Sequence, residues 1–200
     1  NYVRPKINAI FSKKDTPENL WQKCPNCGMM LFHREVKDAL CVCNGCGHHM
    51  LIPPKERLLN LFDGGIYSRI DYADVIEDPL NFRDTKKYTD RIKETRKKTG
   101  EKDAMLLAVG DIGRLKVTVA VQNFLFMGGS MGMSVGNSII AGVNNCIKFK
   151  TPFVMFAAAG GARMQESILS LMQMPRSTVA IQSLREAKLP YVVVLTNPTT

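Results

Sequence analysis

Apolar runs and helical spacing alternate along the chain from about residue 104 onward. Two runs, 104–109 and 115–121, flank Gly110-Asp111-Ile112-Gly113, which predicts a β-hairpin. The later runs 152–159 and 191–195 are apolar almost throughout, as in strands buried on both faces. Because strands and helices alternate, the pattern predicts parallel strands with crossover helices. The helices are expected at 134–147, 163–174 and 177–188, with Pro175 bending or ending the second.

The pattern before residue 104 is more polar and predicts shorter elements. Residues 53–62 are expected to form a short helix, because proline stands at the start and leucines gather on one side, and Asp63-Gly64-Gly65 stops it. Residues 88–98 are expected to form an exposed helix that Gly100 ends. The chain is thus predicted to divide into a polar lead-in at 1–20, a small module at 21–60 and a larger domain at 61–200.

Composition narrows the class of protein. In a chain of 200 residues, 45% are hydrophobic and the formal net charge is +9. The apolar content supports a packed core and argues against global disorder. The basic surplus suits a polyanionic partner, such as nucleic acid or a phosphorylated cofactor, and a merely basic surface is the alternative. No apolar stretch reaches the length of a membrane span and no secretory signal pattern opens the sequence, so we expect a cytoplasmic protein without a membrane partner.

Four cysteines form two knuckles with the spacing of a metal site. Cys24 and Cys27 enclose two residues, Cys43 and Cys46 do the same, and a glycine follows each pair. Two such pairs supply four thiolates for one tetrahedral Zn²⁺. Because four protein ligands leave no open position, the zinc is expected to be structural rather than catalytic.

Other interpretations of these residues are weaker. A disulfide framework conflicts with the reducing compartment that we expect, and a redox pair needs only one knuckle. Cys41 is interpreted as a spare cysteine, because it does not give the two-residue gap. His48 and His49 are expected near the site or on the surface rather than as ligands. Cys146 is expected to be a buried apolar side chain.

Two glycine-rich turns each follow an apolar run and precede a helix. One contains Gly128 and Gly129, and the other contains Gly160 and Gly161. Adjacent glycines at such a junction expose main-chain N–H groups near the positive end of a helix dipole, where they can bind a phosphate or a developing oxyanion. Tight helix–strand packing also requires glycine, so the pattern leaves both interpretations open. Neither turn matches GxGxxG or the GxxxxGK[ST] phosphate loop.

The larger domain lacks the residues of a histidine-dependent hydrolase. No histidine follows His49, so the larger domain offers no Ser-His-Asp set. Chemistry would therefore depend on backbone donors, or on groups that a substrate, cofactor or partner brings.

Several segments together resemble the carboxyltransferase β subunit of bacterial or plastid acetyl-CoA carboxylase. They are the first knuckle with Trp21, the second knuckle through Met50, residues 126–132, and Gly160-Gly161-Ala162-Arg163-Met164-Gln165-Glu166 followed by 169–174. The match covers nearly the whole chain, and its last two motifs are long and specific. The resemblance implies an α/β fold in which a crotonase-like domain of β-β-α units follows a small four-cysteine zinc ribbon. It also implies that the family continues beyond residue 200, so the C-terminal part of the domain is expected to be missing.

The resemblance further implies a reaction and the residues that carry it. A carboxyl group would pass from carboxybiotin to acetyl-CoA and give malonyl-CoA for fatty acid biosynthesis. Gly160 and Gly161 match the oxyanion pair for the acyl-CoA, and Gly128 and Gly129 match another turn that lines the substrate site. Arg163 is interpreted as shaping the site or facing an anion, with a surface salt bridge as the equal alternative. The biotin ureido group would serve as the base, which agrees with the missing histidine.

Partners and cofactors follow from the same resemblance. The biotin carboxyl carrier protein brings biotin, a carboxyltransferase α subunit completes an α₂β₂ assembly, and biotin carboxylase joins the larger ATP-binding complex. Coenzyme A enters as the substrate thioester, and Zn²⁺ occupies the ribbon. In a plant the protein would lie in the plastid stroma. The alternative is a zinc-ribbon module that binds nucleic acid, which would explain the charge and the zinc but leave the glycine turns without a role. A carboxyltransferase acting on propionyl-CoA ranks lower, because such relatives typically lack the ribbon.

Overall fold

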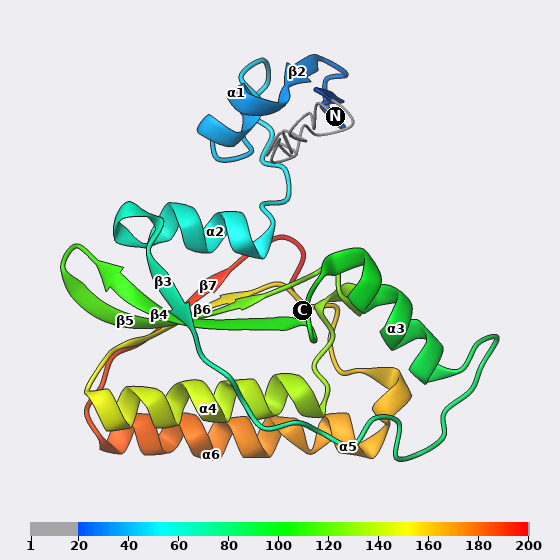
Figure 1. Ribbon diagram of the computed structural model, residues 1–200, viewed down its shortest axis with the longest axis vertical. Coiled ribbons are helices and arrows are strands. Elements are labelled where there is room, and N and C mark those ends of the chain that lie inside the picture. Colours follow the sequence, from blue (N-terminus) through cyan, green and yellow to red (C-terminus); the bar gives the residue numbers. More distant parts are fainter. Residues whose placement is uncertain (1–19, 200) are drawn as a thin grey trace, which may run out of the picture. The chain divides into compact units, whose positions relative to one another are not determined.

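The computed structural model describes residues 20–199, which form two compact units divided after Ile52 (Figure 1). The predicted lead-in at 1–20 lies outside the described residues, apart from Leu20. The division falls earlier than the boundary expected near residue 60. The reason is that helix α2 (Pro54–Leu61) places Leu58 in the core of the larger unit.

The smaller unit is built from a short hairpin and one short helix. Strand β1 (Trp21–Lys23) pairs antiparallel with β2 (Met30–Phe32), and α1 (His33–Asp38) follows directly. The buried side chains at its centre are few: Cys24, Leu31, Val36 and Cys43. A core of this size does not stabilise a fold alone, so such a unit requires a metal or another crosslink.

A five-stranded sheet in the order β3-β4-β5-β6-β7 forms the centre of the larger unit. Strands β4 (Met105–Ile112) and β5 (Leu115–Gln122) make the predicted hairpin, with Ile112 opposite Leu115. Strands β6 (Phe153–Ala157) and β7 (Tyr191–Leu195) continue the sheet in parallel with β5, as the alternation of strands and helices predicted. The short strand β3 (Tyr67–Arg69), which the sequence pattern did not predict, pairs antiparallel with β4.

Helices cover both faces of this sheet (Figure 1). Alternate residues of β4 point to opposite faces: Leu106 packs with α2, and Leu107 packs with α4 (Met133–Phe149) and α6 (Gln173–Glu186). Because β4 and β5 are covered on both sides, buried apolar residues stand at consecutive positions, 105–108 and 119–121, rather than at every second one.

The segment after β6 differs from the single helix expected at 163–174. It forms a 3₁₀ turn, η3 (Met164–Glu166), then the short helix α5 (Ile168–Leu171), and then α6. The break falls at Ser167, whose φ is +47°, and not at Pro175. Pro175 lies in the first turn of α6, where its missing N–H would have had no partner within the helix. The helix expected at 177–188 therefore begins earlier, at Gln173.

The helix α3 (Tyr88–Thr99) confirms the element expected at 88–98. Gly100 ends it in the left-handed conformation, with φ +67°. The helix, which was expected to be exposed, is only partly so, because Tyr88 and Ile92 are buried. A 3₁₀ turn, η1 (Asp63–Gly65), stops α2 as predicted.

Strand β7 also departs from its predicted environment. It forms as expected, but all five of its side chains are exposed, between 37% and 72%. It pairs with β6 on one side, and no other strand among residues 20–199 pairs with its second side. Within residues 20–199, the apolar run therefore lies at the edge of the sheet rather than at its centre.

In the described part of the chain, no helix combines the length and apolar character needed to cross a membrane.

Candidate functional site

The four predicted zinc ligands come together in the smaller unit. The sulfur atoms of Cys24, Cys27, Cys43 and Cys46 all lie within 4.8 Å of one another. The Cys24–Cys46 and Cys27–Cys43 sulfur pairs are 3.7 and 3.8 Å apart. Four sulfur ligands at about 2.3 Å from a tetrahedral Zn²⁺ lie ~3.8 Å from each other. The cluster therefore fits a zinc ion bound by four thiolates.

Main-chain hydrogen bonds shape each knuckle. The N–H of Gly28 donates to Cys24 O at 3.0 Å, and the N–H of Gly47 donates to Cys43 O at 2.8 Å. Both glycines have positive φ, +76° and +69°. The glycine after each pair is thus required by the backbone conformation, as the sequence predicted.

The charges in the cluster favour binding of a cation. The side-chain amide of Asn26, followed by the main-chain N–H of His48, lowers the pKa of Cys46 to about 6. The N–H of Met29 lowers the pKa of Cys27, but hydrogen bonds with Cys46 and the other thiols, together with burial, raise it to about 12. Four sulfurs so close together cannot all ionise without a positive charge between them. A divalent cation supplies that charge, since the thiolate is the ligand form.

The neighbouring residues are placed as expected. Cys41, His48 and His49 do not belong to the four-sulfur cluster. Cys41 is half-buried against the core of the small unit. Cys146 is fully buried in the larger unit, where burial raises the pKa of its thiol.

The two glycine turns lie against each other in the larger unit. The N–H of Gly160 donates to Gly128 O at 2.9 Å, so the turns meet at their glycines. A further main-chain bridge pairs Met131 with Ala162. Gly129 is required by close packing, because a Cβ on it would lie 1.8 Å from Ala158 O. Close packing, one of the two interpretations that the sequence left open, therefore explains Gly129.

The structure distinguishes the two glycines of the predicted oxyanion pair, Gly160 and Gly161. The N–H of Gly160 is occupied by Gly128 O and is not available to a ligand. Gly161 has a φ of +106°, and its N–H has no hydrogen-bond partner among residues 20–199. The sequence could not distinguish these two adjacent glycines, because the difference depends on a carbonyl 32 positions away.

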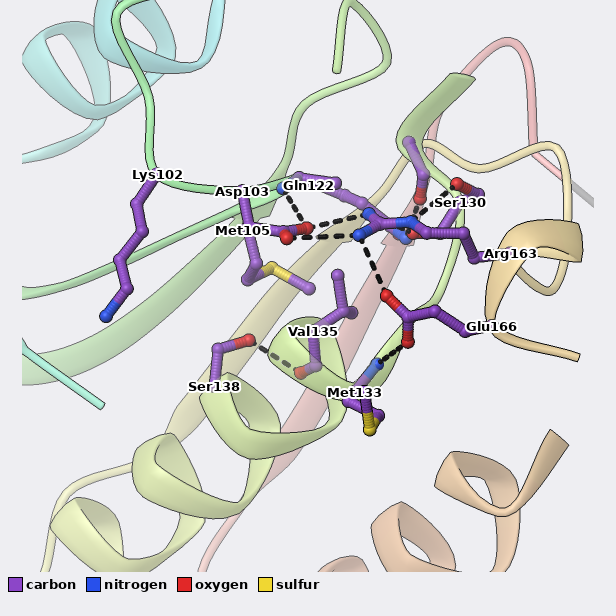
Figure 2. Close-up of polar contacts among 12 residues, drawn as sticks. Lys102, Asp103, Met105, Gln122, Ser130, Met133, Val135, Ser138, Arg163 and Glu166 are labelled. Carbon is purple, nitrogen blue, oxygen red and sulfur yellow. Dashed lines mark hydrogen bonds and ion pairs between the residues drawn. The ribbon is translucent and has the colours of Figure 1, made fainter. Parts of the chain in front are cut away.

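Gln122 joins the two turns from the end of β5. Its amide nitrogen donates to Gly129 O at 2.6 Å, and its amide oxygen accepts from the N–H of Ala158 at 3.2 Å. The side chain is buried (Figure 2). A polar residue that ends an otherwise apolar strand is a signal in the sequence that could have pointed to it.

Arg163 is buried, not on the surface. The residue is 1% exposed, and its guanidinium makes a two-point ion pair with Asp103, at 2.7 and 3.0 Å (Figure 2). Burial lowers the pKa of Arg163, but the charge of Asp103 more than compensates and holds that pKa above its usual range. The surface salt bridge is therefore wrong. The guanidinium does face anions, but in the described residues they are carboxylates of the chain itself.

A pocket opens beside the turns, with a volume of about 500 Å³. Lys86, Arg91 and Glu94 contribute from α3 and the residues before it, and Met127, Ser130 and Ala162 contribute from the turns. Small-molecule sites have volumes of roughly 300–1,000 Å³. This pocket is therefore large enough for part of a ligand next to the Gly161 segment.

The chain belongs to the carboxyl transferase domain family, whose model matches residues 71–200. The similar curated proteins carry the name acetyl-coenzyme A carboxylase carboxyl transferase subunit beta. Those of Jannaschia sp. (strain CCS1) and Dinoroseobacter shibae are each 60% identical over all 200 residues. The chain spans 63% and 62% of these two relatives, a little under two thirds of their length.

Solved structures agree with this family. The transcarboxylase 12S, with methylmalonyl-coenzyme A and methylmalonic acid bound, matches with a TM-score of 0.54 and 26% identity, over 72% of this chain and 26% of that one. The Pseudomonas malonate decarboxylase MdcD-MdcE heterodimer matches with a TM-score of 0.53 and 20% identity, over 74% of this chain and 54% of that one, and supports the fold alone. The predicted α/β carboxyltransferase fold with a four-cysteine module is confirmed.

Proposed function

We propose that the full-length protein is the β subunit of an acetyl-CoA carboxylase carboxyltransferase. Its relatives over the whole chain bear that name, and the two joined glycine turns carry the proposal in this chain. It would act with a carboxyltransferase α subunit, a biotin carboxyl carrier protein and biotin carboxylase. Coenzyme A would enter as the acetyl thioester, and the reaction would take place in the cytoplasm. A nucleic-acid-binding ribbon is not favoured, because the family match covers the larger unit.

The proposed reaction needs a hydrogen-bond donor at the thioester oxygen, and among residues 20–199 the N–H of Gly161 is free to serve as that donor. Acetyl-CoA must lose a proton from its α-carbon before that carbon forms a bond to the carboxyl carbon. The electron pair then rests on the thioester oxygen. The N–H of Gly161 can donate to that oxygen, since no group among residues 20–199 occupies it. Removing one such donor typically lowers kcat about 10²–10³-fold.

The remaining chemistry would be supplied from outside this chain. Biotin, when bound, supplies the carboxyl group and a proton acceptor, so the absence of a histidine after His49 is no obstacle. Lys86 and Arg91 line the pocket beside the turns. Each is paired with a carboxylate of the chain, Glu94 and Asp84 respectively, and would exchange that partner for an acidic substrate. Gly128 and Gly129 would contribute the neighbouring wall. Cys24, Cys27, Cys43 and Cys46 would hold Zn²⁺, which stabilises the ribbon without taking part in the reaction.

The test is the reverse reaction, malonyl-CoA-dependent carboxylation of biocytin. It uses the full-length chain, its α partner, and the mixture of both. We expect turnover only in the mixture. We also expect Gly161→Ala to lower kcat, because a methyl group at φ +106° moves this N–H. Gly113→Ala is the matched control, since Gly113 also has positive φ but faces open space. A folded, zinc-loaded mixture without turnover would contradict the proposal.

A further inference from the structure

The buried Arg163 side chain connects segments that lie far apart in the sequence (Figure 2). Besides its ion pair with Asp103, it binds Ser130 twice: Nε donates to Oγ at 3.1 Å, and Nη2 donates to the main-chain oxygen at 2.9 Å. Nη1 also donates to Tyr88 Oη at 3.3 Å. Asp103 precedes β4, Tyr88 begins α3, and Ser130 follows the first glycine turn. One side chain on the second turn therefore fixes the first turn to two other parts of the domain.

Glu166 makes a second connection between the same segments. Its Oε2 accepts the N–H of Met133 at 2.6 Å, and its Oε1 accepts the hydroxyl of Tyr88 at 2.6 Å. Met133 is the first residue of α4. The N–H groups in the first turn of a helix have no partner within the helix. Glu166 thus occupies the positive end of this helix, where the sequence had suggested room for a ligand anion. Gly132 allows this contact, because a Cβ there would lie 2.6 Å from the Glu166 carboxylate.

Main-chain bonds join the turns on the side of the glycines. The N–H of Met131 donates to Gly161 O at 2.9 Å, and the N–H of Arg163 donates to Met131 O at 2.9 Å. Gly161 is thus held through its carbonyl by one turn, while Arg163 and Glu166 hold the residues on its C-terminal side. The direction of the Gly161 N–H depends on both sets of contacts.

We propose that Arg163, together with Asp103 and Glu166, positions the two glycine turns relative to each other and thereby aims the Gly161 N–H. These are positioning residues, since their side chains contact other protein groups inside the domain. The inference rests on the proposed function, because the aimed N–H matters only if a thioester oxygen meets it. A displacement of about 1 Å at such a donor can lower kcat about 10²-fold.

Conservative variants in the full-length protein, combined with its α partner, test this role. Arg163→Lys keeps the charge but cannot reach Asp103 and Ser130 together. Asp103→Asn keeps the shape and removes the charge. For either variant we expect kcat to fall about 10²-fold while KM for malonyl-CoA changes less than about threefold. Lys116→Gln is the control, because Lys116 forms an exposed ion pair, 4.0 Å from Asp111, and should leave both constants unchanged.

Glu166 provides a rescue comparison that a merely structural role would not produce. Glu166→Gln retains a carbonyl oxygen for the N–H of Met133, whereas Glu166→Ala does not. We expect the glutamine variant to keep most of kcat and the alanine variant to lose it, at equal zinc content. Hydrogen exchange of the amides at 127–133 and 160–167 supplies a second readout, which should become faster in Arg163→Lys and Asp103→Asn.

These outcomes separate the inference from the proposed function. If the wild-type mixture has no activity, the proposed function fails, and exchange at both turns alone decides whether Arg163 positions them. If the wild-type mixture is active, an unchanged kcat in folded Asp103→Asn overturns the positioning role and leaves the function standing. If Arg163→Lys does not fold, Asp103→Asn and the Glu166 pair decide the question.

Discussion

At the scale of single residues, Gly128 and Gly129 show how different two adjacent glycines are. Both have positive φ, +66° and +65°, a region that other residues rarely adopt. A Cβ on Gly128 would meet open space, whereas one on Gly129 would lie 1.8 Å from Ala158 O. Gly128 is therefore required for its backbone conformation alone. Gly129 is required for its conformation and also for the close approach of the opposite turn.

We expect Gly129→Ala to destabilise the full-length protein by about 3 kcal/mol or more, as the sum of left-handed strain and overpacking. Gly113→Ala is the control with positive φ and open space, and should cost only about 1–2 kcal/mol. Urea unfolding of the two variants measures the difference. Equal losses of stability would mean that the opposite turn moves away at little cost.

The sequence predicted sites whose residues lie close together in the chain better than contacts between residues far apart in it. The zinc ligands could be found because two cysteines on one turn bind the same ion, and their spacing alone indicates it. The roles of Arg163 and Asp103 could not be found in this way. They are 60 positions apart, and only the folded sheet brings them together. The motif that contains Arg163 and Glu166 marked the right segment, but it gave no indication that their side chains point inward.

At the scale of elements, the hairpin of β4 and β5 is fixed by a residue outside it. The carboxylate of Asp63, just after α2, accepts the N–H groups of Gly113 and Arg114 at 3.0 and 2.9 Å. These two main-chain bonds lower the pKa of Asp63. The residue that the sequence marked only as the end of a helix therefore also caps a turn 50 positions later.

This contact predicts a pH dependence. Because the folded pKa of Asp63 is below its unfolded value of about 3.9, its stabilising effect is complete above that pH and is lost as pH falls through the folded pKa. Asp63→Asn should lower the urea midpoint at pH 7, and the difference from wild type should shrink below about pH 4. Asp111→Asn on the same hairpin is the control. A difference that stays constant with pH would contradict this assignment.

The zinc module is the second feature at this scale. Cys24→Ser combined with Cys27→Ser should abolish zinc binding and unfold residues 21–52, since a bound structural zinc supplies about 10–16 kcal/mol in small modules. The fold of the larger unit should persist, because its core contains no residue of the smaller unit, which ends at Ile52. Cys41→Ser should keep one zinc per chain. Metal analysis and hydrogen exchange measure both effects, and stoichiometric zinc in the double variant would mean that other ligands bind it.

Helices and strands could be predicted from the sequence where the run of apolar residues or the helical spacing extends over many positions. The eight-residue strands β4 and β5 and the helix α4 stood out, whereas β3 has three residues, two of them polar, and gave no pattern. The break at Ser167 was missed because serine does not usually adopt positive φ, and it does so here between two turns whose other contacts fix them. The exposure of β7 could not be predicted either, since an apolar run specifies a strand but not its neighbours.

At the scale of the whole molecule, the sheet of the larger unit ends in an open edge. Val192, Val193 and Val194 are exposed on a strand whose second side has no partner strand in the described chain. Unpaired N–H and C=O groups beside apolar side chains are a template for pairing with another chain. In this 200-residue form we therefore expect the edge to pair with a second copy of the chain.

We expect the 200-residue chain to associate as its concentration rises, and Val193→Lys to oppose this. A charge on an edge strand should raise the concentration of half-association about tenfold, or ~1.4 kcal/mol. Sedimentation velocity measures it. Ile76→Lys is the control, because Ile76 is also apolar and is even more exposed, but lies outside the sheet. Equal effects of both substitutions would indicate unspecific hydrophobic association.

The contacts of Arg163 also limit how such a sequence can change over evolutionary time. Breaking a buried ion pair by losing one partner typically costs about 3–5 kcal/mol, against a total stability of about 5–15 kcal/mol. A single substitution at Asp103 or Arg163 would therefore usually be removed by selection before a compensating one arose. Among related chains, these positions should be retained together or exchanged together, and their covariation should be stronger than that of the exposed pair Lys116–Asp111.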